Sequence, residues 1–469
     1  MNIFLFNKSL RCFDNTTLIH QIKEEKSVIP IFIMTEQVNK KKNKYFSDNS
    51  VQFMIESIKE LYKNIKYKYN GKLYLFESDN FINVFKIIIK YQKINSIGTN
   101  YDYSPYAKKR QTIIKSFCEK NKIKLYILED HTLYKLTDKS ILKDNGEPYT
   151  VFTPFRNNCM KKLHVPLPDK FKDFKFNIEP LLSKIKYNIK FKEIDKFYRF
   201  NPYINVNGGR TNGLKILKNY QSFNDYSKQR DFLTYNTTFL AAHNHFGTVS
   251  IREVYKTFKR NKGIINELHW RDFYYSLYHH FPHMLEGQIG KNNKPFKLKF
   301  DKINWKNNNE LFIKWIKGEL GIPICDAAMR QLNKTGFMHN RLRMITAGVV
   351  TKLLLINWRY AEKYFAQHLV DYDCIQNSGG WAWTCTGVDP KQIFRIFSPS
   401  IQSSKFDPET KFIKQYIPEL NSVPSKSIHN WESDYIKFPQ VNYPQPQIDY
   451  KKARLEGLKE FSRVSKLKD

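Results

Sequence analysis

Residues 1–34 read MNIFLFNKSLRCFDNTTLIHQIKEEKSVIPIFIM, and their pattern indicates the architecture of the first part of the chain. It places two apolar runs, at 3–6 and 29–34, on either side of a segment around 15–25 that has helical periodicity. Two short apolar strands separated by one helix form a βαβ crossover, which brings the strands together in a parallel sheet.

The same alternation repeats after residue 34, and it predicts a doubly wound, Rossmann-like α/β domain over residues 1–130. Neither a Walker A loop nor a GxGxxG pattern follows the first strand, so the fold by itself indicates no nucleotide site. Further strand-like runs lie at 72–78, 94–98 and 124–130, and further helix-like segments lie around 50–64, 80–92 and 106–121.

The rest of the chain changes character twice. Residues 131–195 are rich in turn residues and Lys, and we expect them to form a long interdomain linker. From 196 to 469 the strand-like runs disappear and apolar residues recur at helical spacing, which predicts an all-α domain. Its most apolar segment, VVTKLLLIN at 349–357, is expected to be a central helix.

Charge is the most conspicuous feature of the composition. The 469 residues include 78 Lys and Arg against 44 Asp and Glu, a formal net charge of +34. Such an excess indicates a polyanionic partner, with nucleic acid as the leading candidate. The excess is spread almost evenly along the chain, however, so a drift in composition would explain it equally well. Hydrophobic residues at 41% exclude a disordered basic tail.

Cysteines and apolar stretches narrow the class of protein further. Six cysteines without CxxC spacing predict neither a zinc ribbon nor an iron–sulfur cluster, and reduced, buried thiols are the simple interpretation. The apolar run at the N-terminus is too short for a signal peptide, and no stretch reaches the roughly 18 apolar residues of a membrane span. We therefore expect a soluble protein of the cytoplasm or nucleus that does not bind membranes.

Two segments, at 266–275 and 339–344, place carboxylate, amide, guanidinium and aromatic side chains on one face of a predicted helix. An amphipathic surface with ordinary ion pairs would produce the same pattern, so both interpretations stay open. The residues at helical spacing are Glu267, Trp270, Arg271 and Tyr274 in the first segment, and Asn340, Arg343 and Met344 in the second.

The stretch LVDYDCIQNSGGWAWT, at 369–384, combines acidic, amide, glycine and tryptophan residues. Its two glycines allow the backbone to approach a flat ligand, and its carboxylates and amide offer hydrogen bonds, so a planar heteroaromatic cofactor would suit it. Together with Trp358 and Trp305, its tryptophans could pass electrons between a buried redox centre and the surface. Any one of them could equally be a plain core residue.

The histidines and one glycine-rich turn carry weaker signals. Two groups of histidines, at 243–245 and 279–283, have no obvious carboxylate or thiolate companion, and we expect no metal site. The run GGRTNG at 208–213 is not a dinucleotide fingerprint, because no strand precedes it.

Taken together, these motifs resemble the photolyase/cryptochrome family over nearly the whole chain. The resemblance implies an N-terminal α/β antenna domain at 1–130, a linker at 131–195 and a helical FAD-binding catalytic domain at 196–469, in agreement with the periodicity. The motifs are RCFDNTTL at 11–18, NYDYSPYAKKR at 100–110, EPYTVFTPF at 147–155, GGRTNGLKIL at 208–217, NELHWRDFYY at 266–275, GIPICDAAMRQLNKTGFMHNRLRM at 321–344 and DYDCIQNSGGWAWTCTGVDP at 371–390.

Within the family, the residues are most similar to class I cyclobutane pyrimidine dimer (CPD) photolyases. Asn377 matches the position that faces flavin N5, where plant-type cryptochromes carry Asp and animal-type ones Cys. Asn340 and Met344 match the CPD enzymes. The alternatives are a (6-4) photolyase, which would carry a pair of histidines in this motif, and a blue-light cryptochrome without repair activity.

The resemblance implies repair of UV-damaged DNA, in which excited, reduced FADH− donates an electron to a flipped-out dimer. It implies catalytic roles for Glu267 and Asn377 and a photoreduction chain of Trp381, Trp358 and Trp305. The residues that it implies for FAD binding are Tyr226, Arg230, Thr237, Thr238, Phe239, Leu240, Arg271, Asn340, Arg343, Asp371, Asp373 and Asn377. The residues that it implies for lesion or DNA binding are Glu267, Trp270, Asn340, Arg341, Met344 and Trp383. Lys405 is a further candidate for phosphate contact.

Two departures from the family pattern concern the cofactors. TTFLA at 237–241 replaces the usual TSRLS or TSxLS turn and lacks its last hydroxyl, although we still expect FAD to bind. The run SPYAKKR at 104–110 lacks the Asn-Glu pair with which folate-antenna photolyases bind methenyltetrahydrofolate, so the antenna chromophore is another one or is absent. We expect a monomer without a metal ion.

Overall fold

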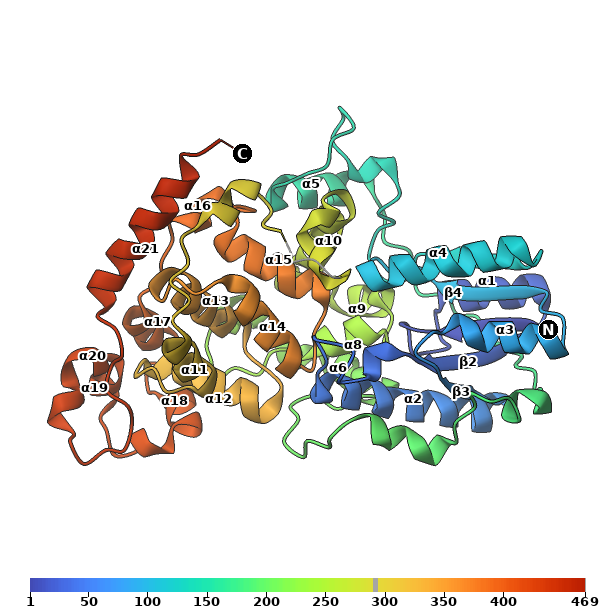
Figure 1. Ribbon diagram of the computed structural model, residues 1–469, viewed down its shortest axis with the longest axis horizontal. Helices are drawn as coiled ribbons and strands as arrows, with labels where there is room; N and C mark the ends of the chain where they lie inside the picture. Colours follow the sequence, from blue (N-terminus) through green and yellow to red (C-terminus); the bar gives the residue numbers. More distant parts are fainter. Residues whose placement is uncertain (290–293, 469) are drawn as a thin grey trace. The chain divides into compact units, whose positions relative to one another are not determined.

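The computed structural model describes residues 1–289 and 294–468, and these form two compact units (Figure 1). One unit contains a parallel sheet and the other is helical, which confirms the predicted fold class. The domain boundaries at 130 and 195 stay a prediction, because neither unit is continuous in sequence. The first unit comprises Met1–Pro202, Val206–Asn224 and Thr238–His279, and the second comprises Tyr203–Asn205, Asp225–Thr237 and His280–Asp469.

The first unit is built on five parallel strands in the order β3-β2-β1-β4-β5. Each strand lies within two residues of its predicted position. The strand order reverses between β1 and β4, so the carboxyl ends of these two strands mark the topological switch point. The strands are β1 (Asn2–Phe6), β2 (Ile29–Met34), β3 (Tyr74–Glu77), β4 (Ser96–Asn100) and β5 (Lys124–Leu128).

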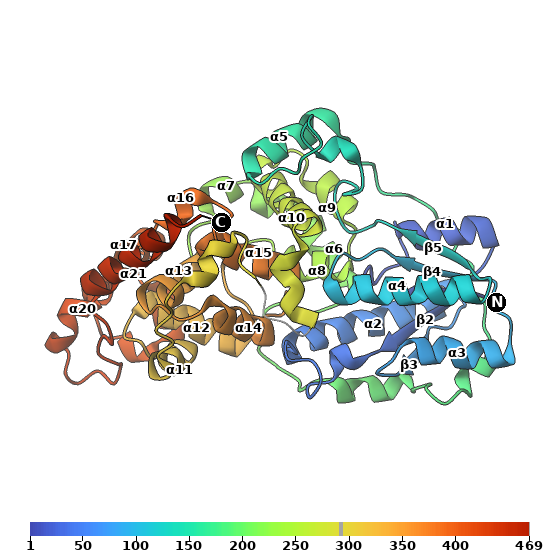
Figure 2. The same ribbon diagram turned by 45° about the horizontal axis from the view of Figure 1, so that its top comes forward.

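Four helices connect and cover these strands. Ile3 and Leu5 of β1 and Ile31 of β2 face α3 and α4 in one apolar cluster, and Figure 2 shows these two helices along one face of the sheet. All six residues of β2 are buried, as expected for a strand that is covered on both faces. The helices are α1 (Thr16–Glu25), α2 (Asp48–Tyr69), α3 (Ile82–Tyr91) and α4 (Pro105–Lys120).

Five further helices belong to the same unit. Helix α5 lies in the segment expected to be irregular, and its buried Phe152, Phe155 and Cys159 form one helical stripe. This stripe is short, so its periodicity is hard to recognise in the sequence. The helices are α5 (Phe152–Lys162), α6 (Arg210–Lys218), α8 (Leu240–Phe246), α9 (Ile251–Phe258) and α10 (Lys262–His280).

The GGRTNG turn at 208–213 uses its backbone to join α6 to α2. Gly208 N donates to Glu56 Oε2 at 2.6 Å, and Thr211 N donates to Glu60 Oε1 at 2.9 Å. Gly209 has a φ of +99°, and a Cβ there would lie 2.3 Å from Glu60 Oε2. The turn therefore serves helix packing, because the carboxylates of α2 already occupy its N–H groups.

The second unit packs its helices around one apolar cluster that contains the buried Trp315, Trp358 and Trp381. Its elements include α7 (Tyr226–Gln229), α11 (Asn309–Lys317), α12 (Pro323–Thr335), α13 (Asn340–Gly348), α14 (Trp358–His368), α15 (Cys374–Cys385), α16 (Pro390–Ile393), α17 (Pro399–Phe406), α18 (Lys411–Tyr416), α19 (Ser425–His429), α20 (Trp431–Asp434) and α21 (Tyr450–Ser465).

Residues 349–356 are buried, as the apolar composition of 349–357 predicts, but the segment is not the regular central helix that we expected. Val349–Leu353 forms a π-helix directly after α13, and the chain turns at Leu355, whose φ is +49°. A run of apolar residues reports burial and not the helix type, so the sequence pattern could not distinguish the two.

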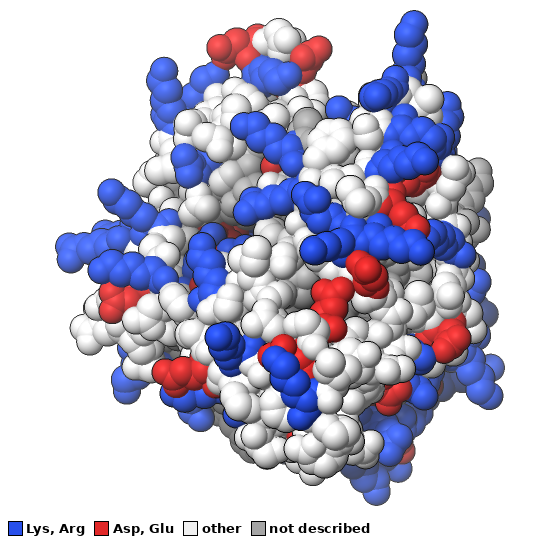
Figure 3. All heavy atoms as spheres, turned by 90° about the vertical axis from the view of Figure 1, so that its left-hand side faces the viewer, with Lys and Arg blue, Asp and Glu red and all other residues white. Residues whose placement is uncertain are grey.

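Figure 3 shows one face of the molecule, on which Lys and Arg side chains are scattered among Asp, Glu and wide areas of other residues. This distribution agrees with the even spread of charge along the sequence. Among the described residues, no helix has both the length and the apolar character needed to cross a membrane.

Candidate functional site

Helix α10 of the first unit has two different faces. Glu267, Trp270 and Tyr274 form a partly exposed stripe with the spacing that the sequence predicts. His269 and Asp272 lie on the opposite side and are buried. The helix thus presents a carboxylate and two aromatic rings on one side while it packs through polar groups on the other.

Trp270 is held in place by a residue that the sequence did not single out. The ring of Phe152 in α5 stacks on the indole of Trp270 with 3.7 Å between ring centroids and an interplanar angle of 8°. Arg156 of the same helix donates to Asn266 Oδ1 at 2.8 Å, next to Glu267. Helix α5 therefore supports the partly exposed stripe of α10 through a stacked ring and a hydrogen bond.

Arg271 is buried and turned toward residues of its own unit. Its Nη1 donates to the carbonyl of His131 at 2.7 Å, and its Nη2 lies 2.5 Å from His131 Nε2. Its guanidinium also lies over the ring of Tyr275, 5.0 Å from the centroid. The contact of Arg271 with FAD stays a prediction.

The predicted FAD turn at 237–241 contains a strained residue. Phe239 has a φ of +52°, which is unusual for a bulky side chain, and α8 begins at the next residue. Leu240 N donates to Thr238 Oγ1 at 3.4 Å. Thr238, Phe239 and Leu240 belong to the first unit, and Tyr226, Arg230 and Thr237 belong to the second.

Helix α13 of the second unit carries the Asn340, Arg343 and Met344 face. Asn340 is exposed, and Arg343 and Met344 are partly exposed. The Nη2 of Arg343 donates to both carboxylate oxygens of Asp371, at 3.0 and 2.8 Å, so these two predicted FAD-binding residues form an ion pair. Arg341 pairs with Asp231 at 2.6 Å and lies over the ring of Phe406, and its predicted contact with DNA stays a prediction.

The predicted site residues of helix α15 differ in exposure. Asn377, Gly380 and Trp383 follow one another at i, i+3 and i+6 and are partly exposed, whereas Trp381 is buried. Asp373 caps the helix, because its Oδ1 accepts from Ile375 N at 2.9 Å and from Gln376 N at 3.2 Å.

Two glycines have open space beside them on these helices. A Cβ at Gly380 in α15, or at Gly348 at the end of α13, would meet no heavy atom within 4 Å. Helices α13 and α15 pack against each other. The indole Nε1 of Trp383 is buried and has no hydrogen-bond partner. Space, a donor without a partner and the nearby amides suit a planar heteroaromatic ring with polar edges.

Glu362 of α14 is a site residue that the sequence analysis missed. It is 1% exposed, and its Oε1 accepts from Asn377 Nδ2 at 3.0 Å and from Ser378 Oγ at 3.4 Å. Burial raises the pKa of Glu362 to about 7, although these two hydrogen bonds oppose the shift. The sequence does place Glu362 on the same helical stripe as Trp358, Ala361 and Phe365, and a carboxylate on such an apolar stripe could have indicated a buried functional residue.

The three tryptophans of the predicted photoreduction chain belong to the second unit. Trp381 and Trp358 are 3% and 2% exposed, and Trp305 packs against the same apolar cluster. The ring of Trp381 contacts that of Phe365, with 5.3 Å between centroids. Their role in electron transfer stays a prediction. In the parts of the chain that are described, no cluster of three or more His, Cys, Asp or Glu residues could hold a metal ion.

Comparison with known proteins identifies similarities over the whole chain. Residues 2–172 match the family model described as DNA photolyase, and residues 264–463 match the one described as the FAD binding domain of DNA photolyase. The chain is 32% identical to the deoxyribodipyrimidine photo-lyase of Buchnera aphidicola subsp. Acyrthosiphon pisum, over 99% of this chain and 97% of that protein. It is 36% identical to the Escherichia coli deoxyribodipyrimidine photo-lyase over 70% of each chain.

Solved structures of similar proteins have the same fold. An archaeal photolyase from Sulfolobus tokodaii with two FAD molecules is 34% identical, with a TM-score of 0.85 over 99% of this chain and 100% of that one. A bacterial class III photolyase from Agrobacterium tumefaciens is 27% identical, with a TM-score of 0.86 over 99% and 98%. A cryptochrome from Synechocystis, 22% identical with a TM-score of 0.84 over 98% and 99%, shares the fold.

Proposed function

The chain belongs to the DNA photolyase family, and from this premise we propose that it repairs UV-damaged DNA by splitting cyclobutane pyrimidine dimers in light. FAD is the cofactor of this reaction: when bound, reduced and excited by light, it would supply the electron that splits the dimer and would recover it afterwards. The protein supplies the binding, orientation and electrostatic environment.

The observation that carries the proposal is the open space beside Gly380 on α15. Asn377 and Trp383 are its neighbours on the same partly exposed stripe. An amide and an indole beside such a space supply a polar contact and a flat apolar wall, which a planar ring requires. The pair Arg343–Asp371 adds fixed charge within the same unit.

Asn377 is held in one orientation by Glu362. Both Nδ2 bonds of the amide go to Glu362, at 3.3 Å to its carbonyl and 3.0 Å to Oε1. The amide oxygen of Asn377 would then be the atom available to accept a hydrogen bond from a ring N–H of the cofactor. Glu362, with a pKa of about 7, serves as a nearby site that can hold or release a proton.

The lesion requires a different set of contacts. A flipped-out dimer presents the polar edges of two pyrimidines and their apolar faces. We assign the edge to the Glu267 carboxylate, and the faces to Trp270, which Phe152 supports, and to Trp383. Asn340, Arg341 and Met344 contact the lesion or its flanking phosphates in this proposal. A monomeric state and a cytoplasmic or nuclear location remain predictions.

One experiment tests the function directly. The reduced protein is irradiated with DNA that contains either cyclobutane dimers or (6-4) photoproducts, and the loss of each lesion is followed. We expect the cyclobutane dimers to disappear in light and to persist in the dark. Loss of (6-4) photoproducts instead would indicate a (6-4) photolyase, and loss of neither would favour a cryptochrome without repair activity.

A further inference from the structure

The buried face of α10 is attached to the segment Asp130–Tyr134, which follows β5 and which we call the strap. Asp272 Oδ2 accepts from Leu133 N at 2.8 Å and from Tyr134 N at 3.3 Å. The hydroxyl of Tyr134 lies 3.1 Å from His269 Nε2. Successive strap residues thus contact the side of α10 that lies opposite Glu267 and Trp270.

A third residue of the strap binds the same helix. The carbonyl of His131 accepts from Arg271, and its ring Nε2 lies 2.7 Å from the hydroxyl of Tyr275. Contacts with four side chains of α10 leave this helix little freedom to rotate about its axis or to slide along it. A rotation would carry Glu267 and Trp270 away from their present directions.

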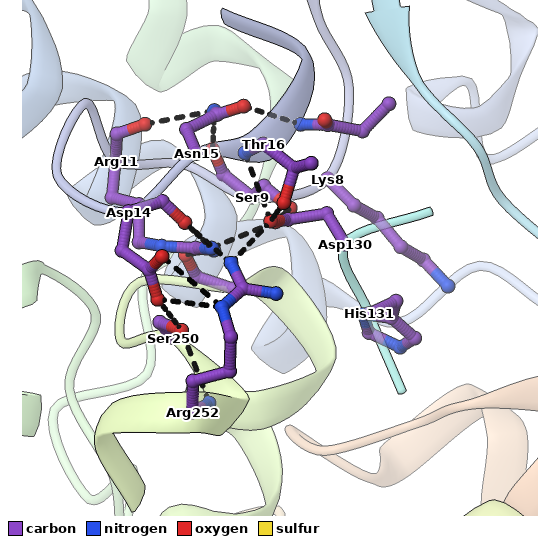
Figure 4. Close-up of polar contacts among 12 residues, drawn as sticks. Lys8, Ser9, Arg11, Asp14, Asn15, Thr16, Asp130, His131, Ser250 and Arg252 are labelled. Carbon is purple, nitrogen blue, oxygen red and sulfur yellow. Dashed lines mark hydrogen bonds and ion pairs between the residues drawn. The ribbon is translucent and has the colours of Figure 1, made fainter. Parts of the chain in front are cut away.

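The other end of the strap is fixed by a buried network of charges, shown in Figure 4. Asp130 accepts from Arg11 and from Arg252, each at 2.7 Å. It also accepts from the hydroxyls of Ser9 and Thr16, each at 2.6 Å. Since Asp130 is 3% exposed and fully paired, the strap starts from a rigid point at the carboxyl end of the sheet.

We infer that the strap positions the Glu267 and Trp270 face of α10 for its ligand, and that Asp272 is the positioning residue that connects the two. The inference rests on the proposed function, because that function makes this face the lesion-binding one. It assigns no chemical step to Asp272, whose carboxyl is buried on the opposite side of the helix.

The shortest contacts of the Asp272 carboxyl are the hydrogen bonds from the strap, whereas its ion pair with Arg271 is longer. Burial raises the pKa of Asp272 to about 7, although Arg271 at 3.7 Å and the two backbone N–H groups of the strap oppose the shift. Glu129 adds a like charge. The Cys159 thiol and the Tyr134 phenol also interact with this carboxyl, and the pKa of each is raised, mainly by burial. A carboxyl that is partly protonated near neutral pH keeps both strap bonds through one oxygen.

Replacement of Asp272 tests the inference in the dark with the full chain loaded with reduced FAD. In Asp272→Ala, the amides of Leu133 and Tyr134 should exchange hydrogen at least about tenfold faster, because their acceptor is gone. The ratio of affinities for dimer-containing and undamaged DNA should fall by about tenfold at unchanged flavin content. Asp272→Asn keeps an acceptor oxygen and should restore most of both properties.

A matched pair of milder variants decides the question if Asp272→Ala does not fold. Tyr134→Phe removes the hydroxyl that contacts His269, whereas Tyr126→Phe removes a hydroxyl of β5 that donates to Glu25 Oε1 at 2.7 Å. The first should lower lesion preference by about threefold, since one hydrogen bond of the strap is lost. The second should leave it unchanged, because Tyr126 does not touch α10.

The outcomes separate this inference from the proposed function. If amide exchange at Leu133 and Tyr134 accelerates but lesion preference stays at the wild-type value, the strap has no positioning role and the repair function stands. Equal effects of Tyr134→Phe and Tyr126→Phe would overturn the inference in the same way. If the wild-type protein shows no lesion preference and repairs neither lesion, the proposed function fails and the inference fails with it.

Discussion

Asp130 of the first unit and Glu362 of the second are both buried carboxylates, yet their environments are opposite. Burial opposes the ionisation of Asp130, but the guanidinium groups of Arg11 and Arg252 outweigh it and hold the pKa of Asp130 below its usual range. Glu362 receives only an amide and a hydroxyl, so burial prevails and raises its pKa to about 7. One unit fixes a charge in place, while the other keeps a proton exchangeable near neutral pH.

Removal of the Asp130 carboxylate should have the largest effect on stability. Asp130→Ala leaves Arg11 and Arg252 buried without their shared partner, and we expect the free energy of unfolding to fall by about 3–5 kcal/mol. Chemical denaturation followed by circular dichroism measures this loss. A loss below about 1 kcal/mol would mean that the network is not the rigid point from which the strap starts.

Glu362→Gln tests how the second carboxylate, Glu362, makes the free energy of unfolding depend on pH. The folded-state pKa of Glu362 is raised from its ordinary value of 4.5 to about 7, so its contribution to stability is complete below pH 4.5 and is lost as pH rises to about 7. This loss amounts to about 3 kcal/mol. Glu362→Gln should remove it, and the variant should therefore lose less stability than the wild type between pH 5 and pH 8.

Asp130 provides a control, because its contribution to stability should depend on pH in the opposite direction to that of Glu362. Because its folded-state pKa is lowered from the ordinary value of 3.8, its contribution to stability is present above that pH and is lost in acid. The Glu362→Gln variant should keep this loss of stability below pH 4. Identical curves for the variant and the wild type between pH 5 and pH 8 would show that Glu362 is ionised in the folded protein.

The sequence predicted most of the sheet and the polar stripes of α10, α13 and α15, because each depends on a local period of two or 3.6 residues. It did not predict that Phe152 stacks on Trp270 or that Glu362 binds Asn377, since those pairs come from segments far apart in the chain. It also missed that Arg271 turns toward His131, because burial of a charged side chain depends on partners that periodicity does not report.

Glu267 is a third kind of carboxylate, since it is partly exposed on the stripe of α10 that we propose binds the lesion. Glu267→Gln should lower the yield of dimer repair by about tenfold, because a hydrogen bond to a charged acceptor is replaced by a weaker, neutral one. Flavin content and the free energy of unfolding should not change. The measurement is dimer loss per absorbed photon with chemically reduced enzyme, and Glu147→Gln, an exposed residue before α5, is the matched control. An unchanged yield would remove Glu267 from the repair site.

An exposed ion pair, Lys306–Glu456, should contribute the least of these carboxylate contacts to the free energy of unfolding. Lys306 Nζ lies 2.5 Å from Glu456 Oε2, closer than either arginine lies to Asp130, but their side chains are 53% and 41% exposed. Water already solvates both charges, so Glu456→Gln should change the free energy of unfolding by no more than about 1 kcal/mol. Denaturation under the conditions used for Asp130→Ala measures the difference. A loss as large as that of Asp130→Ala would mean that distance, and not burial with complete pairing, decides how much a carboxylate contributes to this protein.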